Sequence, residues 1–378
     1  MNIGDFIAGS FIQQYQYKSF FPNTINKEWV WNDPQLNTLL AEAHRQLGEL
    51  NAFSLYVPDI DFFIKMHVVK EATTSSRIEG TQTNVEDALL KEEDILTDKK
   101  NDWKEVQNYI AAMNYAVAQL QTTPISTRLL KKVHKILLTN TRGKDKLPGE
   151  FRVSQNWIGG VSLKDAVFIP PHHEEVGQLM GDLENFLHNE NIYVPPLIRI
   201  AIAHYQFETI HPFLDGNGRI GRLLIALYLV QQKLLAKPTL YLSAYFEKNK
   251  SLYYDNLTIV RSANNLTQWI KFFLVGVIEI SRQGTETFQK ILRLRDEIEG
   301  KKILSLGKKI PSSKKFVSLL YTSPIVSAAD VVDKISISTP TANSLIKDFE
   351  ALGILKKISG EKRNRLFVFS EYMALFQQ

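Results

Sequence analysis

Most of this chain repeats its apolar residues at the spacing of an α-helix, and this period constrains the fold more than any other feature. Apolar positions recur every three to four residues, which places them on one face of a helix. The pattern predicts helices over residues 33–55, 60–79, 101–121, 125–139, 173–189, 195–209, 218–234, 249–262, 265–283 and 285–305. We therefore expect a mainly helical protein.

One stretch, residues 147–171, interrupts the helical period. It contains Pro148, Gly149, Gly159 and Gly160, and it ends in a Pro-Pro pair, with residues typical of strands in between. Glycine and proline mark turns, and short runs of β-type residues around them favour a hairpin. We predict a short β-hairpin here.

Composition excludes several classes of protein. Of the 378 residues, 44% are hydrophobic and 22% are charged, values that are too apolar for a disordered chain and suit two or three globular domains. The absence of cysteine excludes disulfides, cysteine zinc sites, iron–sulfur clusters and a cysteine nucleophile. No apolar run is long enough for a membrane span, and no secretory signal is visible. A cytoplasmic location without membrane contact is expected.

The C-terminal fifth differs from the rest in charge and pattern. Residues 301–378 carry 13 basic and 6 acidic residues, a net charge of +7, whereas the remaining 300 residues sum to −2. After a predicted joint at 307–311, short helices are expected at 313–322 and 326–335, and a third helix has Thr339 as N-cap and Gly353 as its stop. Alternating strands follow at 354–358 and 365–369. This order predicts a winged helix-turn-helix domain.

The strongest chemical signal is the segment His211-Pro-Phe-Leu-Asp-Gly-Asn-Gly-Arg-Ile-Gly-Arg222, which lies between two apolar helical segments. Gly216 and Gly218 lack Cβ atoms, so the backbone can curl and approach a ligand closely. Successive N–H groups in such a turn, together with the start of the next helix, bind anions. The segment predicts a phosphate-binding loop at a helix N-terminus.

The side chains of this segment add charge, a metal ligand and a base. Arg219 and Arg222 lie three residues apart and can reach one face to hold phosphates. Asp215 offers hard oxygen ligands that suit Mg²⁺ bound to phosphates. His211 has the pKa range of a general base. Together they indicate an Mg²⁺–nucleotide site with a base beside it.

The same segment resembles the Fic motif, His-Pro-Phe-x-Asp-Gly-Asn-Gly-Arg-x-x-Arg, and matches each of its fixed positions. Arg152-Val-Ser-Gln-Asn-Trp-Ile-Gly-Gly-Val with Phe168-Ile-Pro-Pro171 resembles the family's flap hairpin, and Ser251-Leu-Tyr-Tyr254 resembles its adenine-side helix. The resemblance runs from about residue 60 to the end. It implies a mainly α fold with a Fic-type helical core and a β-hairpin flap, plus a small α+β winged helix-turn-helix domain.

The resemblance implies transfer of AMP from ATP to a Ser, Thr or Tyr hydroxyl of a target protein, with the chain itself as one candidate target. His211 would deprotonate that hydroxyl, and Asp215 would hold Mg²⁺ on the α- and β-phosphates. Arg219 would hold the outer phosphates, Arg222 the γ-phosphate, and Tyr254 would line the adenine pocket. The implied nucleotide-binding set is Gly216, Asn217, Gly218, Arg219, Ile220, Gly221, Arg222 and Tyr254. The implied flap residues, which align the target backbone, are Trp157, Ile158, Gly159 and Gly160.

A regulator is expected in the same chain. Ser75-Ser-Arg-Ile-Glu79-Gly80 fits the family's inhibitory pattern, Ser/Thr-x-x-x-Glu-Gly/Asn, and it ends a predicted helix upstream of the core. The resemblance implies that Glu79 pairs with Arg222 and so occupies the arginine that the γ-phosphate needs. Ser75 and Gly80 complete the implied inhibitory set.

Two other functions stay open. The first is the reverse reaction, de-AMPylation, or transfer from another nucleotide donor. The second is a DNA-binding regulator whose Fic core senses nucleotide, because winged helices place their third helix in the major groove. Lys362, Arg363 and Arg365 on the wing suit phosphates, although the third helix carries no arginine. A homodimer is a further possible assembly.

Other residues have plainer interpretations. His204 is expected to be a core histidine, and His172 and His173 are expected at the surface or at a helix start. Glu208 lies three residues before His211 and could orient it. The expected division of the chain is an N-terminal helical region with the inhibitory helix (1–100), a Fic core (101–284), a helical linker (285–310) and the winged helix-turn-helix domain (311–378).

Overall fold

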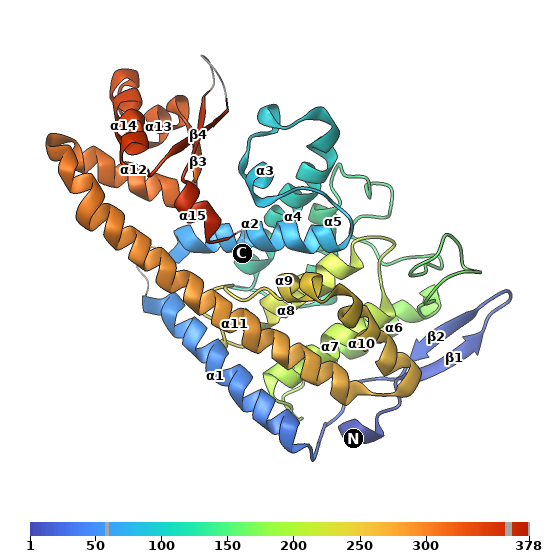
Figure 1. Ribbon diagram of the computed structural model, residues 1–378. Helices are drawn as coiled ribbons and strands as arrows, with labels where there is room; N and C mark the ends of the chain where they lie inside the picture. Colours follow the sequence, from blue (N-terminus) through green and yellow to red (C-terminus); the bar gives the residue numbers. More distant parts are fainter. Residues whose placement is uncertain (57–59, 360–364, 377–378) are drawn as a thin grey trace.

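The computed structural model describes residues 1–56, 60–359 and 365–376, and they form a mainly helical molecule (Figure 1). The helices are α1 (Pro34–Tyr56), α2 (Ile60–Ile78), α3 (Val85–Leu89), α4 (Lys100–Gln119), α5 (Thr127–Leu137), α6 (Val176–His188), α7 (Pro196–Ile210), α8 (Asn217–Gln231), α9 (Ser243–Lys248), α10 (Lys250–Ala263), α11 (Leu266–Glu297), α12 (Ile310–Thr322), α13 (Ala328–Ile335), α14 (Thr339–Ala351) and α15 (Ser370–Ala374). The strands are β1 (Gly9–Gln13), β2 (Lys18–Pro22), β3 (Ile325–Ser327), β4 (Lys356–Ser359) and β5 (Leu366–Val368). The helical period thus predicted the fold class correctly. None of the helices in the described ranges has the length and apolar character needed to cross a membrane.

The centre of the molecule is the helix pair α7 and α8. All residues of α7 from Leu197 to Ile210 are buried, as are nearly all residues of α8 up to Leu229. A helix that is buried on every side lies inside the core rather than on it, so the neighbouring helices, among them α6 and α11 against α7, cover this pair. The turn that joins α7 to α8 holds the segment predicted to bind phosphate.

The long helix α11 lies beside α1 along one edge of the molecule (Figure 1). It runs unbroken through residue 284, where two separate helices and a boundary between core and linker were expected. The reason is packing: a Cβ at Gly284 would lie 2.9 Å from the Leu50 side chain, so the glycine admits α1 instead of ending the helix. Further on, Gly307 has φ 55° and ψ −119° and forms the predicted joint.

The C-terminal part contains the three short helices and the following pair of strands that the sequence pattern predicted. Helices α12, α13 and α14 pack beside a three-stranded antiparallel sheet in the order β3-β5-β4. The third helix is capped by Ser338, whose side chain accepts the Thr341 N–H, so the expected N-cap Thr339 is wrong by one residue. Adjacent hydroxyl residues before Pro340 are equally good caps in sequence terms, and only the backbone angles separate them. The wing residues Lys362 and Arg363 lie outside the described residues.

The predicted flap hairpin is a long loop closed by one antiparallel β-bridge. Ile158 N–H donates to Phe168 O at 2.8 Å, and Phe168 N–H donates back at 3.1 Å. Beyond that bridge the Asp165 carboxylate accepts the N–H groups of Val161 and Ser162. A side chain thus satisfies backbone donors that a longer strand ladder would use, which is why no regular strands form.

An N-terminal hairpin that the sequence pattern did not predict lies next to the flap. Strands β1 and β2 pair in register from Gly9↔Pro22 to Gln13↔Lys18. Phe20 N–H donates to Ile169 O at 2.9 Å, and the Phe20 ring contacts the Phe168 ring. Most residues of β1 are exposed whichever face they lie on, so the strand lacks the alternation that marks a half-buried strand.

Candidate active site

His211 ends α7 in a left-handed conformation, with φ 50°. Its carbonyl oxygen accepts hydrogen bonds from Arg152 Nε at 3.0 Å and Asn156 Nδ2 at 3.2 Å. A non-glycine residue with positive φ is held there by its surroundings. Two side chains that precede the flap bridge therefore fix the backbone of the predicted base.

The turn before α8 has the geometry of an anion-binding loop. Gly216 is left-handed, with φ 79°, and its N–H donates to its neighbour Asp215. The first turn of any α-helix leaves its N–H groups without intrahelical acceptors, so those of Asn217 and Gly218 are available to a ligand. The Asn217 side chain instead bonds both the N–H and the C=O of Phe213, each at 2.8 Å. Asn217 thus offers a ligand only its backbone.

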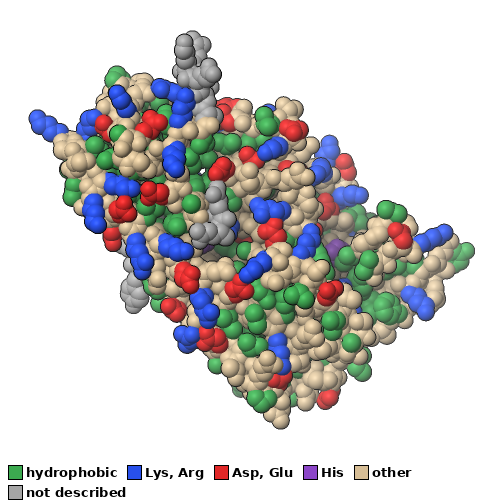
Figure 2. Space-filling model, viewed as in Figure 1, with side chains coloured by type: hydrophobic (Ala, Val, Ile, Leu, Met, Phe, Trp, Pro, Cys, Tyr) green, Lys and Arg blue, Asp and Glu red, His purple; other side chains and the backbone are tan. Residues whose placement is uncertain are grey.

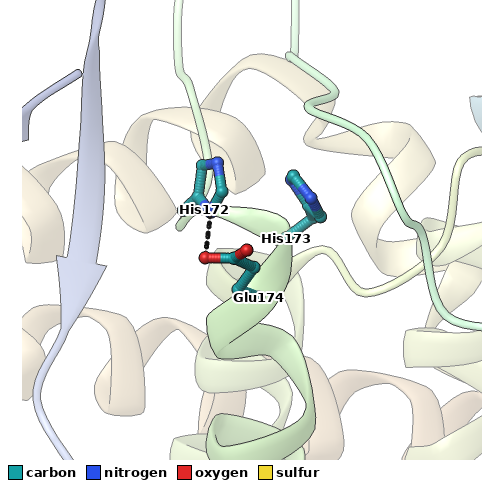
Figure 3. Close-up of side chains that lie close together, drawn as sticks. All are labelled: His172, His173 and Glu174. Carbon is teal, nitrogen blue, oxygen red and sulfur yellow. Dashed lines mark ion pairs between the residues drawn. The ribbon is translucent and has the colours of Figure 1, made fainter. Parts of the chain in front are cut away.

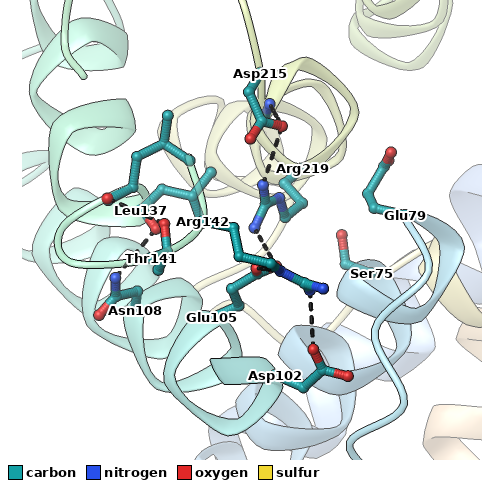
Figure 4. A network of polar contacts seen from close by, with 12 residues as sticks. Ser75, Glu79, Asp102, Glu105, Asn108, Leu137, Thr141, Arg142, Asp215 and Arg219 are labelled. Atoms are coloured by element: carbon teal, nitrogen blue, oxygen red, sulfur yellow. Dashed lines mark hydrogen bonds and ion pairs between the residues drawn. The ribbon is translucent and has the colours of Figure 1, made fainter. Parts of the chain in front are cut away.

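Arg219 lies in a network of ion pairs (Figure 4). Its guanidinium contacts Glu105 at 3.3 Å and Asp215 at 3.5 Å, and its Nε is buried without a hydrogen-bond partner. Arg142 completes the network through Glu105 at 2.8 Å and Asp102 at 2.9 Å. The orphaned Nε and the exposed side of Asp215 leave capacity for an incoming phosphate.

The residues around Asp215 fit a magnesium ion. The Asp215 side chain is 42% exposed, and Oδ2 faces Gly143, where a Cβ would come within 2.6 Å of it. The Asp215 carbonyl is held by His134 Nε2 at 2.9 Å, and the His134 ring stacks on Phe213. Mg²⁺ usually binds one or two carboxylates and keeps its other positions for phosphate and water. One accessible carboxylate beside a phosphate loop meets that need.

Arg222 is almost fully enclosed by the end of α2. Its Nε donates to Ser75 Oγ and its Nη2 to Ser75 O, both at 2.8 Å, while Nη2 also contacts Glu79 Oε1 at 2.7 Å. Burial opposes the charge of both partners, but the mutual attraction wins and holds the pKa of Glu79 below, and that of Arg222 above, its ordinary value. The structure therefore contains the ion pair expected from the sequence.

The Glu79 carboxylate also lies over the phosphate loop. A Cβ built on Gly218 would collide with Glu79 Oε1 and approach Arg222 Nη1 to 2.8 Å. The carboxylate thus stands against the first turn of α8, where an anionic ligand would bind. Gly80, with φ 101°, turns the chain away immediately afterwards and lets Glu79 project from the end of α2.

The His211 imidazole is largely buried beside Glu208. Burial lowers its pKa to about 4, Glu79 acts against that shift and Arg152 acts with it. The ring is consequently neutral near pH 7 and able to accept a proton. Glu208 Oε2 lies 3.9 Å from His211 Nδ1, too far for a hydrogen bond, so the orienting contact considered for Glu208 is not formed.

The remaining expected nucleotide residues do not all face the loop. Tyr254 on α10 is 39% exposed, and burial raises its pKa to about 12, with Glu79 adding to the shift. Ile220 is 1% exposed, and its N–H is used by Gly216 O. Gly221 faces the Glu208 carboxylate, which a Cβ would strike. The Ile220 side chain and the Gly221 α-carbon therefore face the core side of α8, and the place of these residues in the nucleotide-binding set stays a prediction.

The flap residues lie where a partner can reach them. Ile158 makes the single bridge, and Gly159 and Gly160 turn the chain with φ 69° and 72°. Trp157 is 39% exposed although it is one of the largest apolar residues. The four expected residues form one exposed corner of the loop.

Sequence reasoning missed five residues that shape this site: Glu105, His134, Arg142, Arg152 and Asn156. All lie outside the 211–222 segment. His134, Arg152 and Asn156 bond its backbone carbonyls. Glu105 pairs with Arg219, and Arg142 pairs with Glu105. Arg152 begins the stretch that resembles the family's flap. No pattern in one sequence shows that its guanidinium donates to the carbonyls of His211 and Pro171.

Three histidines outside the 211–222 segment lie where the sequence analysis expects them, in the core or at a helix start. His204 is fully buried and bonds Gly221 O at 3.0 Å and Tyr253 Oη at 2.9 Å, which confirms a core histidine. His172, His173 and Glu174 lie together at the start of α6 (Figure 3), with ligand atoms within 4.8 Å of one another. They are consecutive residues, and no side chain from another described element joins them.

The winged-helix part shows mixed charge. Helix α14 is the helix expected to read bases. Lys309, which precedes α12, bonds Ser344 of that helix at 2.8 Å and pairs with its Asp348. Figure 2 shows acidic side chains among the basic ones on this part of the surface. These contacts give no specific support to base recognition.

Comparison with known proteins agrees with this site. Residues 37–118 match the model of the Fic/DOC family N-terminal region, and residues 124–229 match that of the Fic/DOC family. A curated relative, protein adenylyltransferase Fic of Drosophila erecta, is 32% identical over 160 residues, which are 41% of this chain. The aligned part spans only 30% of that relative's length.

Solved structures share the fold. A Fic family protein from Desulfovibrio desulfuricans G20 aligns over 91% of this chain and 98% of its own, with 20% identity and a TM-score of 0.58. A Fic domain containing signaling protein from Bacteroides thetaiotaomicron VPI-5482 aligns over 68% of this chain and 97% of its own, with 17% identity and a TM-score of 0.54. Residues 37–118 and 124–229 of this chain thus carry the N-terminal region and the Fic region of the Fic/DOC family.

Proposed function

We propose that this protein transfers AMP from ATP to a Ser, Thr or Tyr hydroxyl of a target protein and that Glu79 inhibits the transfer. The observation that carries the proposal is the phosphate loop at the start of α8, placed beside a buried, neutral His211 and filled by the Glu79 carboxylate. An anion of the chain thus occupies an anion site next to a base. The adenylyltransferase relatives support AMP as the transferred group.

The chemistry requires charge neutralisation and a base more than a nucleophile. His211 takes the proton of the target hydroxyl, the hydroxyl oxygen bonds to the α-phosphorus, and the α–β bridging bond breaks to release pyrophosphate. The N–H groups of Asn217 and Gly218 and the guanidinium of Arg219 hold the phosphates as charge moves to the leaving group. Asp215 would hold Mg²⁺, which supplies further positive charge at the phosphates.

Inhibition follows from one arginine with two possible partners. Arg222 is paired with Glu79 at 2.7 Å and with Ser75 at 2.8 Å, and charge-assisted hydrogen bonds of this kind are strong when shielded from water. A γ-phosphate that needs Arg222 must displace the carboxylate. Without that displacement the triphosphate cannot settle along the loop.

The test measures label from ATP that is radioactive at the α-phosphate, with Mg²⁺ and a cell lysate. We expect Glu79→Gly to label itself and lysate proteins about tenfold or more above wild type, and His211→Ala in the same background to abolish label. Glu79→Gln is the matched control, since it keeps the length of the side chain and removes only its charge. Its label should lie between wild type and Glu79→Gly.

Other outcomes would redirect the proposal. Label that comes only from a different nucleotide would overturn ATP as donor. Release of AMP from labelled protein by wild type but not by Glu79→Gly would favour the reverse reaction. Label that is unchanged by Glu79→Gly would remove Glu79 as inhibitor.

A further inference from the structure

Glu208 is a buried carboxylate that the proposed chemistry does not use. It lies one turn before His211 on α7, a helix whose residues from Leu197 to Ile210 are all buried. Its Oε1 has no hydrogen-bond partner among the described residues. An ionisable group without partners is costly inside a protein, so its retention at this place needs a reason.

The His211 ring nitrogen that faces Glu208 is also without a hydrogen-bond partner among the described residues. His211 Nδ1 is buried and accepts or donates no hydrogen bond among the described residues, and it lies 3.9 Å from Glu208 Oε2. The contacts from Arg152 and Asn156 hold the His211 carbonyl, not its ring. His211 Nδ1 thus faces Glu208 Oε2 across a gap about 1 Å longer than a hydrogen bond, while the other carboxylate oxygen, Oε1, has no partner among the described residues.

The space around Glu208 is shaped by the phosphate-binding helix. A Cβ at Gly221 would strike Glu208 Oε1, so the glycine leaves room for the carboxylate. No side chain of α8 stands between Glu208 and the backbone at that point. The same helix thus presents its first turn to the ligand and its second turn to Glu208.

Glu208 changes between its neutral acid and its ionised carboxylate near neutral pH. Burial raises its pKa to about 7, Arg222 and Arg261 act against that shift, and Glu79 adds to it. These groups come from α8, α10 and the end of α2. The Glu208 carboxylate in turn helps to raise the pKa of Tyr253 on α10, after burial as the main cause.

We propose that Glu208 is the positioning residue for His211, accepting its Nδ1–H and so leaving Nε2 as the free base. The inference rests on the proposed function and adds a second residue to it. The contact closes when substrate orders the site, as catalytic hydrogen bonds are often long in ligand-free structures. The ionised carboxylate then fixes the tautomer and stabilises the imidazolium that forms when the hydroxyl proton arrives.

The kinetic test compares Glu208→Gln with its parent in the full-length Glu79→Gly protein. We expect the maximal rate of self-labelling to fall about 10- to 100-fold with the KM for ATP unchanged. The parent rate should rise between about pH 6 and 8, and the rise should be absent in Glu208→Gln. Glu184→Gln, which alters a half-buried carboxylate on α6 far from the loop, should match the parent.

The second measurement does not depend on transfer. Nitrogen-15 NMR of the histidine side chains reports which ring nitrogen of His211 carries the proton, with His211→Ala used for assignment. We expect Nδ1–H above pH 7 in the parent and a mixture of tautomers in Glu208→Gln. A predominant Nε2–H tautomer, or rates within twofold and the same pH profile in both variants, would overturn the proposal. Failure of the Glu79→Gly parent to label itself would instead count against the proposed function.

Discussion

The two loops beside His211 are held in opposite ways. In the loop between α7 and α8, Asn217 bonds both backbone groups of Phe213, and His134 holds the Asp215 carbonyl. The flap between α5 and α6 is closed by a single β-bridge, and its corner faces solvent. The loop between α7 and α8 is held by hydrogen bonds from buried side chains, whereas the flap has backbone N–H and C=O groups that no strand ladder uses.

This difference matches what each loop would bind under the proposed function. A nucleotide presents the same phosphates at every turnover, so a preorganised cradle loses little energy to rearrangement. A target protein arrives as an extended backbone, and free edges can pair with it in the manner of an added strand. The comparison predicts that damage to the first loop affects chemistry and that damage to the second affects target binding.

The largest effect should come from Asn217→Ala. The substitution leaves the buried Phe213 N–H without a partner and leaves Asn156 Nδ2 as the remaining described donor to Phe213 O, so the loop loses part of what holds its shape. In the Glu79→Gly background we expect self-labelling to fall about 100-fold or more, with a stability loss of about 2 kcal/mol by chemical denaturation. Asn217→Asp keeps the acceptor and loses the donor, and its activity should lie in between. Full activity of Asn217→Ala would show that the loop is not held by this side chain.

A smaller effect is expected from Ile158→Pro in the flap. Proline removes the N–H that donates to Phe168 O and so opens the bridge. The KM for a lysate-derived target should rise about tenfold, while the affinity for ATP, measured by calorimetry, stays constant. Val161→Ala, at an exposed position next to the bridge, serves as control. A parallel loss of ATP affinity would mean that the two loops are not independent.

The two regions should also differ in how a carboxylate beside each of them responds to pH: Glu208 on α7, before the first loop, and Asp165 in the flap. Burial raises the pKa of Glu208 from 4.5 to about 7, so the fold binds its proton more tightly than the unfolded chain does. Its contribution is therefore favourable at low pH and is lost as the pH rises through 7. Glu208→Gln should raise the unfolding free energy by about 1–2 kcal/mol at pH 8 and by less at pH 5, measured by urea denaturation.

The smallest effect is expected for Asp165→Asn in the flap. Hydrogen bonds from Ser162 and Val161 lower the pKa of the exposed Asp165, so any stabilisation is present above its ordinary pKa and fades as the pH falls through the lowered value. The same urea measurements should show only a small decrease in the unfolding free energy at pH 8, because solvent screens this exposed carboxylate. A change as large as that of Glu208→Gln would contradict the view that the flap is only loosely coupled to the core.

Sequence pattern predicted the helices well because their apolar faces are local and periodic. It failed around residue 284, where two separate helices are expected and one continuous helix, α11, is found. Gly284 lies within this helix and leaves room for the Leu50 side chain of α1. It also failed at the N-terminal hairpin, whose first strand is mostly exposed and carries no alternation. In both places the deciding factor was a contact with a distant segment, which periodicity does not encode.

The candidate site divides in the same way. The glycines, the aspartate and the arginines of residues 211–222 could be assigned from sequence, because a phosphate loop is built from consecutive backbone groups. That Ile220 and Gly221 face the core side of α8 could not be predicted, since position within a motif does not reveal which side of a helix a residue faces. The contacts of Glu105, His134 and Arg152 with that segment could not be predicted.

By itself the sequence determined a helical chain that carries one phosphate-binding turn, because both features depend on residues within a few positions of each other. The pairing of Glu79 with Arg222, 143 residues away, was expected from the family resemblance alone, and the tertiary structure is what forms it. The contact of Glu105 with Arg219, 114 residues away, came from the tertiary structure only. Charged side chains at such separations meet only when packed helices bring them together, and burial then makes each charge depend on its partner. The loop is thus local in origin, whereas its occupation by the chain's own carboxylate is a property of the fold.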